Sequence, residues 1–103
     1  MNYQKLINTN IKRLRIKLGL TQEEFAEKIG ISLQGLSNLE RNRDQPTSST
    51  IDKICKIFQV SPIELLLVEN KTNEDILFNI NSLLKNCSVK KLKQIYEIIL
   101  LLL

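Results

Sequence analysis

Apolar residues recur at intervals of three and four along most of the chain, which is the spacing of one face of an α-helix. In residues 3–18, the side chains of Ile7, Ile11, Leu14 and Leu18 form a single apolar stripe of this kind. The pattern predicts six further helices, over residues 22–29, 33–40, 48–58, 62–67, 74–85 and 89–103. We therefore expect an all-α fold.

Polar residues at the predicted helix boundaries agree with these limits. Thr21 can cap the second helix, while Glu24, three residues later, can reach back to the backbone of Thr21 in a capping box. Gly30 can adopt the positive φ that a sharp turn requires, and Ser32 is a suitable cap for the third helix. The second and third helices are therefore expected to be short and joined by a tight turn.

The third predicted helix has one apolar face and one polar face. Leu36 and Leu39 are three residues apart and share the apolar face. The other face carries the neutral hydrogen-bonding side chains of Gln34, Ser37 and Asn38, and the cation Arg41 follows them. Gln and Asn can each pair with adenine through two hydrogen bonds, and Ser is adaptable. This face therefore predicts contact with the base edges of DNA, within a two-helix motif that spans residues 22–41.

Gly35 interrupts this helix with a residue that has no side chain. In a helix interior, glycine costs about 1 kcal/mol relative to alanine. Two interpretations stay open at this point. The glycine is either a simple imperfection or a position where the helix backbone approaches DNA closely.

The chain is mildly basic, and its charge is unevenly distributed. The net charge is +4 over 103 residues. Residues 1–20 contain no acid, and their cations are Lys5, Lys12, Arg13, Arg15 and Lys17. A block of one sign is commonly a solvated helix face. Beside a helix that reads DNA, it favours a surface that contacts phosphates.

The sequence lacks the residues that several kinds of catalysis and metal binding require. Histidine is absent, which removes His-based acid–base chemistry and most transition-metal sites. Cys55 and Cys87 have no CxxC spacing, and Cys55 fits an apolar helical pattern as a core residue. No nucleophile–base pair and no phosphate-binding glycine loop is evident. We therefore expect no enzyme, no catalytic residue, no metal and no cofactor.

The two ends of the chain show no pattern of membrane targeting. The N-terminal residues MNYQKLINTNIKRLRIK contain no continuous apolar stretch of the signal-peptide type. The C-terminal run IILLLL is far shorter than the roughly 20 residues that a membrane-spanning helix needs. We therefore expect a cytoplasmic location and no membrane partner.

Residues 11–67 resemble the Cro/CI-type (XRE) family of helix-turn-helix transcriptional regulators. In order and at the spacing of the family, the resemblance is carried by Ile11, Leu14, Arg15, Gly19–Gln22, Phe25, Ala26, Ile29, Gly30, Leu36, Leu39, Glu40, Arg41, Pro46, Val60 and Ser61. It covers a little over half of the chain. The resemblance implies a five-helix, lambda-repressor-like DNA-binding domain over residues 1–67, with its motif at 22–41.

The resemblance also implies roles for individual residues. The third helix of such domains lies in the DNA major groove. On this chain, the side chains that would face base edges are Leu33, Gln34, Ser37 and Asn38. The residues that would contact phosphates are Gln22, Ser32, Arg41, Asn42 and Arg43. Leu33 departs from the polar residue often found there in the family, so it would touch a thymine methyl or contribute nothing specific.

Arg15 and Glu40 are expected to form an ion pair inside the domain. In the family that the chain resembles, the corresponding arginine of the first helix bonds the glutamate that ends the third. Glu40 follows the inward Leu39 and is the only acid in residues 28–43. The alternative is that both residues are ordinary surface charges. On the first interpretation, Arg15 is structural and does not contact DNA.

Residues 74–103 extend the chain beyond this domain, after a predicted linker at 68–73. Their apolar stripes cannot be fully buried by two helices alone, and the run 98–103 places apolar residues on every face of the last turns. One interpretation is that the helical pair binds a second copy, since paired DNA half-sites require a dimer. Alternatively, it folds back on the first and fifth helices, or it docks a protein partner such as a toxin or an antirepressor.

These expectations combine into one main function and one alternative. We predict a sequence-specific transcriptional regulator that binds double-stranded DNA as a homodimer through residues 74–103. It would act as a repressor on a pseudo-palindromic operator, with the third helix in the major groove. The alternative is an antitoxin or another protein-interaction module that acts through the C-terminal helices. The two functions can coexist in one chain.

Overall fold

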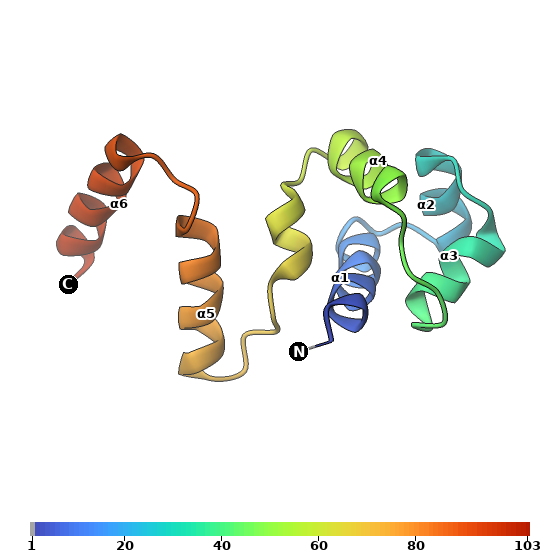
Figure 1. Cartoon of the computed structure of the whole chain (residues 1–103), viewed down its shortest axis with the longest axis horizontal. Helices are drawn as coiled ribbons and strands as arrows, with labels where there is room; N and C mark the ends of the chain where they lie inside the picture. The colour runs from blue at the N-terminus through green and yellow to red at the C-terminus, as the bar shows by residue number, and fades with distance from the viewer. Residues whose placement is uncertain (1) are drawn as a thin grey trace. The chain divides into compact units, whose positions relative to one another are not determined.

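The computed structural model describes residues 2–103, and within this range every regular element is a helix (Figure 1). The elements are α1 (Tyr3–Lys17), α2 (Gln22–Ile29), α3 (Leu33–Glu40), α4 (Ser48–Phe58), the 3₁₀-helix η1 (Pro62–Leu66), α5 (Asn73–Leu84) and α6 (Val89–Leu102). The predicted all-α class is confirmed. The predicted limits of the second and third helices also agree with α2 and α3.

Local side-chain bonds explain why α2 begins and ends where it does. The backbone N–H of Glu24 donates to the Thr21 hydroxyl over 3.1 Å, and the N–H of Thr21 donates to the Glu24 carboxylate over 2.9 Å. The predicted capping box is thus confirmed, and it satisfies N–H groups that the first turn leaves without helical partners. Gly30 ends the helix with φ at 74°, the left-handed conformation that glycine adopts without strain.

The hydrophobic core lies where α1, α2, α3, α4 and η1 meet. Its buried members are Ile11, Phe25, Ala26, Ile29, Leu36, Ile54 and Leu65. The rings of Phe25 and Phe58 stack with their centroids 4.9 Å apart, which joins α2 to α4. Fully burying one large apolar side chain contributes about 1.5–3 kcal/mol. This cluster therefore fixes α2 and α3 against the other helices and holds their polar faces outward.

Cys55 has the core role expected of it. It is half-buried and packs against the buried cluster. Burial is the main cause that raises the pKa of the Cys55 thiol, and the negative charges of Asp52 and Glu64 add to the effect. A raised pKa keeps the thiol protonated, so Cys55 behaves as a small apolar residue.

The fifth predicted helix differs from the expectation, because it is the 3₁₀-helix η1 and not an α-helix. Its start is as predicted, since Pro62 follows Ser61 and the N–H of Ser61 donates to the Glu64 carboxylate over 2.6 Å. Its end is set by Asn10 of α1, whose side-chain amide donates to the carbonyl groups of Leu65 and Leu67, each over 2.7 Å. These carbonyls are satisfied across the domain, so a longer helix is not needed to bond them.

The chain divides into two compact units, one ending at Leu67 and the other spanning Val68–Leu103. The segment predicted as a linker belongs with the second unit through Asn79 of α5. The Val68 N–H donates to the side-chain oxygen of Asn79 over 2.8 Å, and the Asn79 amide donates to the Val68 carbonyl over 2.7 Å and to Asn70 over 2.6 Å. The first residues of this segment are therefore hydrogen-bonded to α5.

The second unit buries little of its apolar surface. Asn79 is the one buried residue in the range 68–103, all of which the structure describes. In α6, no residue is buried, and Leu101 and Leu102 are 86% and 80% exposed. Figure 1 shows that α5 and α6 run in opposite directions. No helix within residues 2–103 has the length and apolar character needed to cross a membrane.

Candidate DNA-binding surface

The α3 helix presents the predicted polar face at the surface. Ser32 caps it by accepting a hydrogen bond from the Gly35 N–H over 2.9 Å. Leu36 and Leu39 are buried, which orients the opposite side of the helix outward. Of the residues predicted to face base edges, Gln34 is exposed, and Ser37 and Asn38 are half-buried.

Leu33, the fourth predicted base contact, begins α3 and is 50% exposed. Its aliphatic side chain has no hydrogen-bonding group. An exposed aliphatic group at the start of a helix that enters the major groove suits contact with a thymine methyl. The structure therefore leaves both of the interpretations made for Leu33 open.

The side chains of Gln34 and Asn38 are brought together on α3. The Gln34 amide nitrogen donates to the Asn38 side-chain oxygen over 3.0 Å. Residues four apart lie one above the other on a helix, which makes this contact possible. The bond leaves the Gln34 oxygen and the Asn38 amide nitrogen for other partners, so the pair presents both an acceptor and donors.

Gly35 has a local explanation that neither sequence interpretation included. A Cβ atom built on Gly35 would lie 3.0 Å from the Ser32 hydroxyl oxygen. That oxygen is the cap of the helix, so a side chain here would crowd the group that starts α3. The missing side chain is therefore compatible with a tightly capped helix, whatever its role toward DNA.

Arg15 of α1 and Glu40 at the end of α3 form a two-pronged ion pair. The Arg15 Nε lies 2.7 Å from one Glu40 carboxylate oxygen, and Nη2 lies 2.9 Å from the other. A third guanidinium nitrogen donates to the Leu20 carbonyl over 2.9 Å. The hydrogen bond to Glu40 is the main cause that raises the pKa of Arg15. Since the Glu40 side chain is only 3% exposed, the pair connects α3 to α1 from within the domain.

Gln22 joins this ion pair, which the sequence did not indicate. Its side-chain nitrogen donates to a Glu40 oxygen over 3.1 Å, and the residue is half-buried. Gln22 was predicted to contact phosphate. A primary amide carries two N–H groups, so one remains for another acceptor. The structure therefore shows Gln22 bonding inside the protein and retaining one donor.

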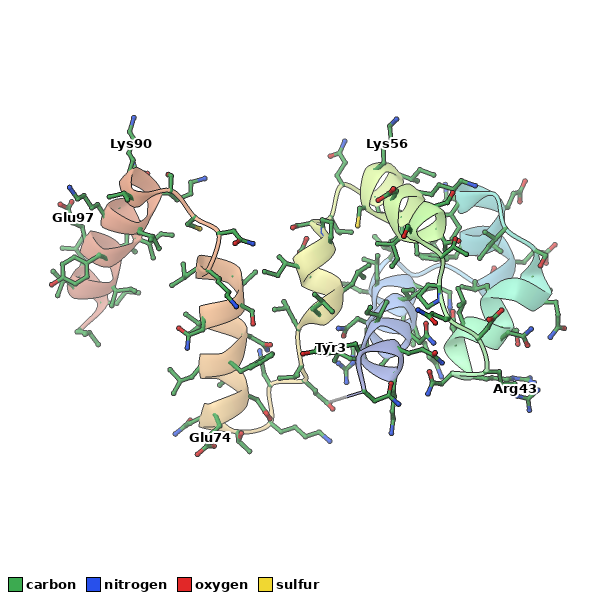
Figure 2. All side chains as sticks on the ribbon, viewed as in Figure 1. Tyr3, Arg43, Lys56, Glu74, Lys90 and Glu97 are labelled. Carbon is green, nitrogen blue, oxygen red and sulfur yellow. The ribbon has the colours of Figure 1, made fainter. Side chains whose placement is uncertain are left out.

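The loop after α3 contains the remaining predicted phosphate contacts. Arg41 and Arg43 are exposed, and Figure 2 labels Arg43 on this loop. Asn42 is also exposed, but its side-chain oxygen accepts hydrogen bonds from the protein itself. The donors are the amides of Asn8 and Gln4, over 3.0 and 3.1 Å. Asn42 therefore has a bond to α1 that no sequence motif indicated.

Asn8 and Asn10 are the residues of this region that sequence reasoning missed. Both are buried on α1, and both donate to distant segments of the chain. One signal was present, because Asn8 lies two helical turns before Arg15 and therefore shares its inward face. A polar residue on an inward face has to find a partner.

The cations of residues 1–20 differ in how far they are engaged within the protein. Arg15 is engaged with Glu40, and an Arg13 guanidinium nitrogen donates to the Asn10 side-chain oxygen over 3.2 Å. Lys5, Lys12 and Lys17 are exposed. Two of the five cations therefore make bonds within the first unit. Within residues 2–103, no group of three or more metal-ligating side chains comes together.

The α2 and α3 helices are both capped, both contribute to the core, and are joined by a short turn. With the polar outer face of α3, this arrangement is that of a helix-turn-helix DNA-binding protein. A profile of the helix-turn-helix family matches residues 11–65, which is more than half of the chain. The chain therefore belongs to this family, and the resemblance to the XRE-type regulators is confirmed.

Several curated relatives share this region. The chain is 42% identical over 72 residues to an uncharacterised HTH-type transcriptional regulator, y4dJ, of Sinorhizobium fredii, covering 70% of this chain and 94% of that protein. It is 37% identical over 75 residues to the regulator ImmR of Bacillus subtilis, covering 71% of this chain and 59% of ImmR. It is 41% identical over 61 residues to the antitoxin PezA of Streptococcus pneumoniae, covering 59% of this chain and 39% of PezA.

These matches define the class of activity. The family model describes a helix-turn-helix, and the first two relatives are named as HTH-type transcriptional regulators. The chain is accordingly a DNA-binding transcriptional regulator with a lambda-repressor-like helical domain. No solved structure matches the chain at a significant level.

Proposed function

We propose that the protein is a dimeric repressor that binds a pseudo-palindromic operator, with α3 of each copy in the major groove. The observation that carries this proposal is the outer face of α3, where Gln34, Ser37 and Asn38 offer neutral hydrogen-bonding groups. Arg41 and Arg43 follow directly in the chain and are exposed. Neutral groups flanked by cations suit base edges flanked by phosphates.

The coupled pair of Gln34 and Asn38 is the proposed centre of base recognition. Adenine presents an acceptor and a donor side by side in the major groove. The free oxygen of Gln34 supplies the complementary acceptor, and the free amide nitrogen of Asn38 supplies the complementary donor. One good paired contact of this kind discriminates against a wrong base by about 1–3 kcal/mol.

The proposed phosphate contacts use groups that the fold leaves available. Arg41 and Arg43 contribute full positive charges at the surface. Ser32 accepts from Gly35, which leaves its hydroxyl hydrogen for an acceptor outside the protein. Gln22 and Asn42 each retain at least one amide hydrogen. These contacts set the position of the protein on DNA and the salt dependence of its affinity.

Dimerisation is proposed through α5 and α6, because their apolar side chains remain exposed. A shallow depression lies between the two helices and is lined by Phe78, Asn81, Ser82, Leu84, Lys85 and Leu92. Further exposed apolar residues on the pair are Ile76, Leu77, Ile80, Leu83, Val89, Tyr96, Ile98, Ile99, Leu100, Leu101, Leu102 and Leu103. Exposed apolar side chains in such number favour an interface.

The charges on these helices favour a second copy as the occupant. The first turn of α5 is acidic, with Glu74 and Asp75, whereas α6 starts with the cations Lys90 and Lys91. Because α5 and α6 run in opposite directions, these two ends are kept apart within one chain (Figure 1). A second copy can place the acidic end of its α5 beside the basic end of α6.

Selection of bound DNA from a random pool, followed by sequencing, tests the proposal. We expect two inverted half-sites with centres about 34–36 Å apart, which is one helical turn of DNA. The variant Gln34→Ala with Asn38→Ala should lose the preference at the half-site while still binding DNA non-specifically. The matched control is Gln45→Ala with Asn86→Ala, which removes the same amide groups from exposed positions outside α3, α5 and α6.

Two outcomes of this experiment would contradict the proposal. Unchanged base preference in the α3 variant would show that another face reads DNA. A single, unpaired half-site would contradict the dimeric operator. A reporter placed behind the selected operator then separates repression from activation, because repression needs only that the bound protein blocks the promoter.

A second candidate function is that of an antitoxin, in which α5 and α6 bind a toxin. It is favoured by the 41% identity to a relative named antitoxin PezA, together with the exposed apolar surface of α6. Sedimentation of the purified chain distinguishes the candidates. A dimer that dissociates only at low concentration supports self-association. A monomer that forms a complex with the product of an adjacent toxin gene supports the second function.

A further inference from the structure

Asn8 makes an unusual connection between α1 and the loop that follows α3. The residue is 1% exposed. Its side-chain nitrogen donates to the side-chain oxygen of Asn42 over 3.0 Å and to the backbone carbonyl of Asp44 over 2.9 Å. Both amide hydrogens are thereby used, and Arg43 lies in the chain between the two residues that Asn8 holds.

The loop leaves α3 through left-handed backbone. Asn42 has φ at 56°, a conformation that asparagine adopts more readily than most residues with a side chain. The Asn42 N–H donates to the Leu39 carbonyl over 2.9 Å, and the Arg43 N–H donates to the Asn38 carbonyl over 2.8 Å. These bonds close the end of α3, and the bonds from Asn8 fix the same turn from the other side.

The orientation of the Asn8 amide follows from its partners. The Asp44 carbonyl can only accept a hydrogen bond, so the Asn8 nitrogen has to face it. The Asn8 oxygen is then left buried with no hydrogen-bond partner within residues 2–103. A buried oxygen without a partner is unfavourable. The two hydrogen bonds that the Asn8 nitrogen donates to the loop are therefore formed at the cost of an unpaired Asn8 oxygen.

We infer that Asn8 is a positioning residue for DNA binding, which acts by holding residues 42–44 so that Arg43 is presented to a phosphate. This inference rests on the proposed function, since it requires the loop to contact DNA. Asn8 itself is buried and does not touch DNA. Its contribution is pre-organisation, because a loop already held in its bound conformation loses less freedom on binding.

The salt dependence of DNA affinity tests this role. Each phosphate contact contributes about 0.9 to the slope of log K against log salt concentration. Asn8→Ala should make this negative slope shallower by about that amount, and it should weaken binding several-fold. The preference between the selected operator and a mutated one should stay unchanged, because α3 still reads the bases.

Asn10→Ala is the matched control. Asn10 is also buried on α1 and also donates to two oxygens, but these belong to Leu65 and Leu67, away from the α3 loop. Both variants should lose thermal stability, whereas only Asn8→Ala should change the salt slope. If Asn8→Ala does not fold, Asn8→Ser, which keeps one donor, replaces it and should lower the slope by a smaller amount.

A double-mutant cycle with Arg43→Ala separates the positioning role of Asn8 from the phosphate contact of Arg43. If Asn8 acts through Arg43, the slope of the double variant should equal that of Arg43→Ala alone. Additive losses, or equal slopes for Asn8→Ala and Asn10→Ala, would overturn the inference while leaving the proposed function in place. An Arg43→Ala variant with no change in slope would contradict the proposed phosphate contact itself.

Discussion

The two units of the chain use apolar residues in opposite ways. The unit that ends at Leu67 buries a cluster of apolar side chains that five elements contribute. The unit Val68–Leu103 is richer in leucine and isoleucine, yet its one buried residue is the polar Asn79. Apolar side chains stabilise a fold only when they are removed from water. The first unit therefore has a core of its own, and the second has surface that suits a partner.

This difference is sharpest for substitutions of large side chains. Phe25→Ala in the first unit should lower the free energy of unfolding by about 3–5 kcal/mol, because it leaves a cavity beside Phe58. Leu101→Ala in α6, at a side chain that is 86% exposed, should change it by less than about 0.5 kcal/mol. Urea unfolding of each variant at low protein concentration measures both. Similar losses for the two would mean that the second unit also has a packed core.

The ion pair of Arg15 and Glu40 should give the next largest effect. Glu40→Ala leaves Arg15 without its carboxylate at a position that is largely buried, which costs about 3 kcal/mol or more. Thermal unfolding gives the loss. Glu69→Ala is the control, because Glu69 forms an exposed ion pair with Lys71, and such pairs contribute roughly 0–1 kcal/mol. A loss below about 1 kcal/mol for Glu40→Ala would show that the pair is dispensable.

A substitution on α6 should affect association and leave the first unit intact. Ile99→Glu places a charge in the exposed apolar surface and should raise the dissociation constant of the dimer at least tenfold, or about 1.4 kcal/mol. Sedimentation equilibrium measures this constant. Glu97→Gln, at an exposed position on the same helix, should change it little (Figure 2). A monomeric wild-type chain would instead refute the proposed dimer.

The smallest expected effect is a pH dependence that originates at the start of α2. Hydrogen bonds from the backbone and side chain of Thr21 hold the pKa of Glu24 below its ordinary value of 4.5. The lowered pKa stabilises the folded state above pH 4.5, and the contribution is lost as the pH falls through the folded-state pKa. Glu24→Gln should flatten this part of the stability curve. Unfolding measured between neutral pH and about pH 3 compares the two proteins, and parallel curves would contradict the assignment.

Helix limits were predictable because the groups that set them are neighbours in sequence. Thr21 and Glu24 are three residues apart, as are Ser32 and Gly35, so their bonds can be inferred from spacing alone. The apolar face of α3 was predictable for the same reason. The base-reading role of its polar face stays a prediction until DNA binding is measured.

The contacts that hold the candidate site join residues that are far apart in sequence. Asn8 reaches Asn42 and Asp44 across more than thirty positions, and Asn10 reaches Leu65 and Leu67 across more than fifty. The sequence around an asparagine in a predicted helix does not indicate which distant group its side chain will bond. The partner of Gln22 was missed for this reason, although the partner of Arg15 was available from the family resemblance.

The sequence by itself determined the all-helical class, the helix-turn-helix motif and the capped ends of its helices, because period and capping are local properties. The tertiary structure alone decided that η1 is a 3₁₀-helix, that Gln22 joins the Arg15–Glu40 pair, and that Asn8 holds the loop after α3. Each of these depends on where a polar group finds its partner once the core has packed, and buried polar groups have to be satisfied wherever the fold brings a partner to them.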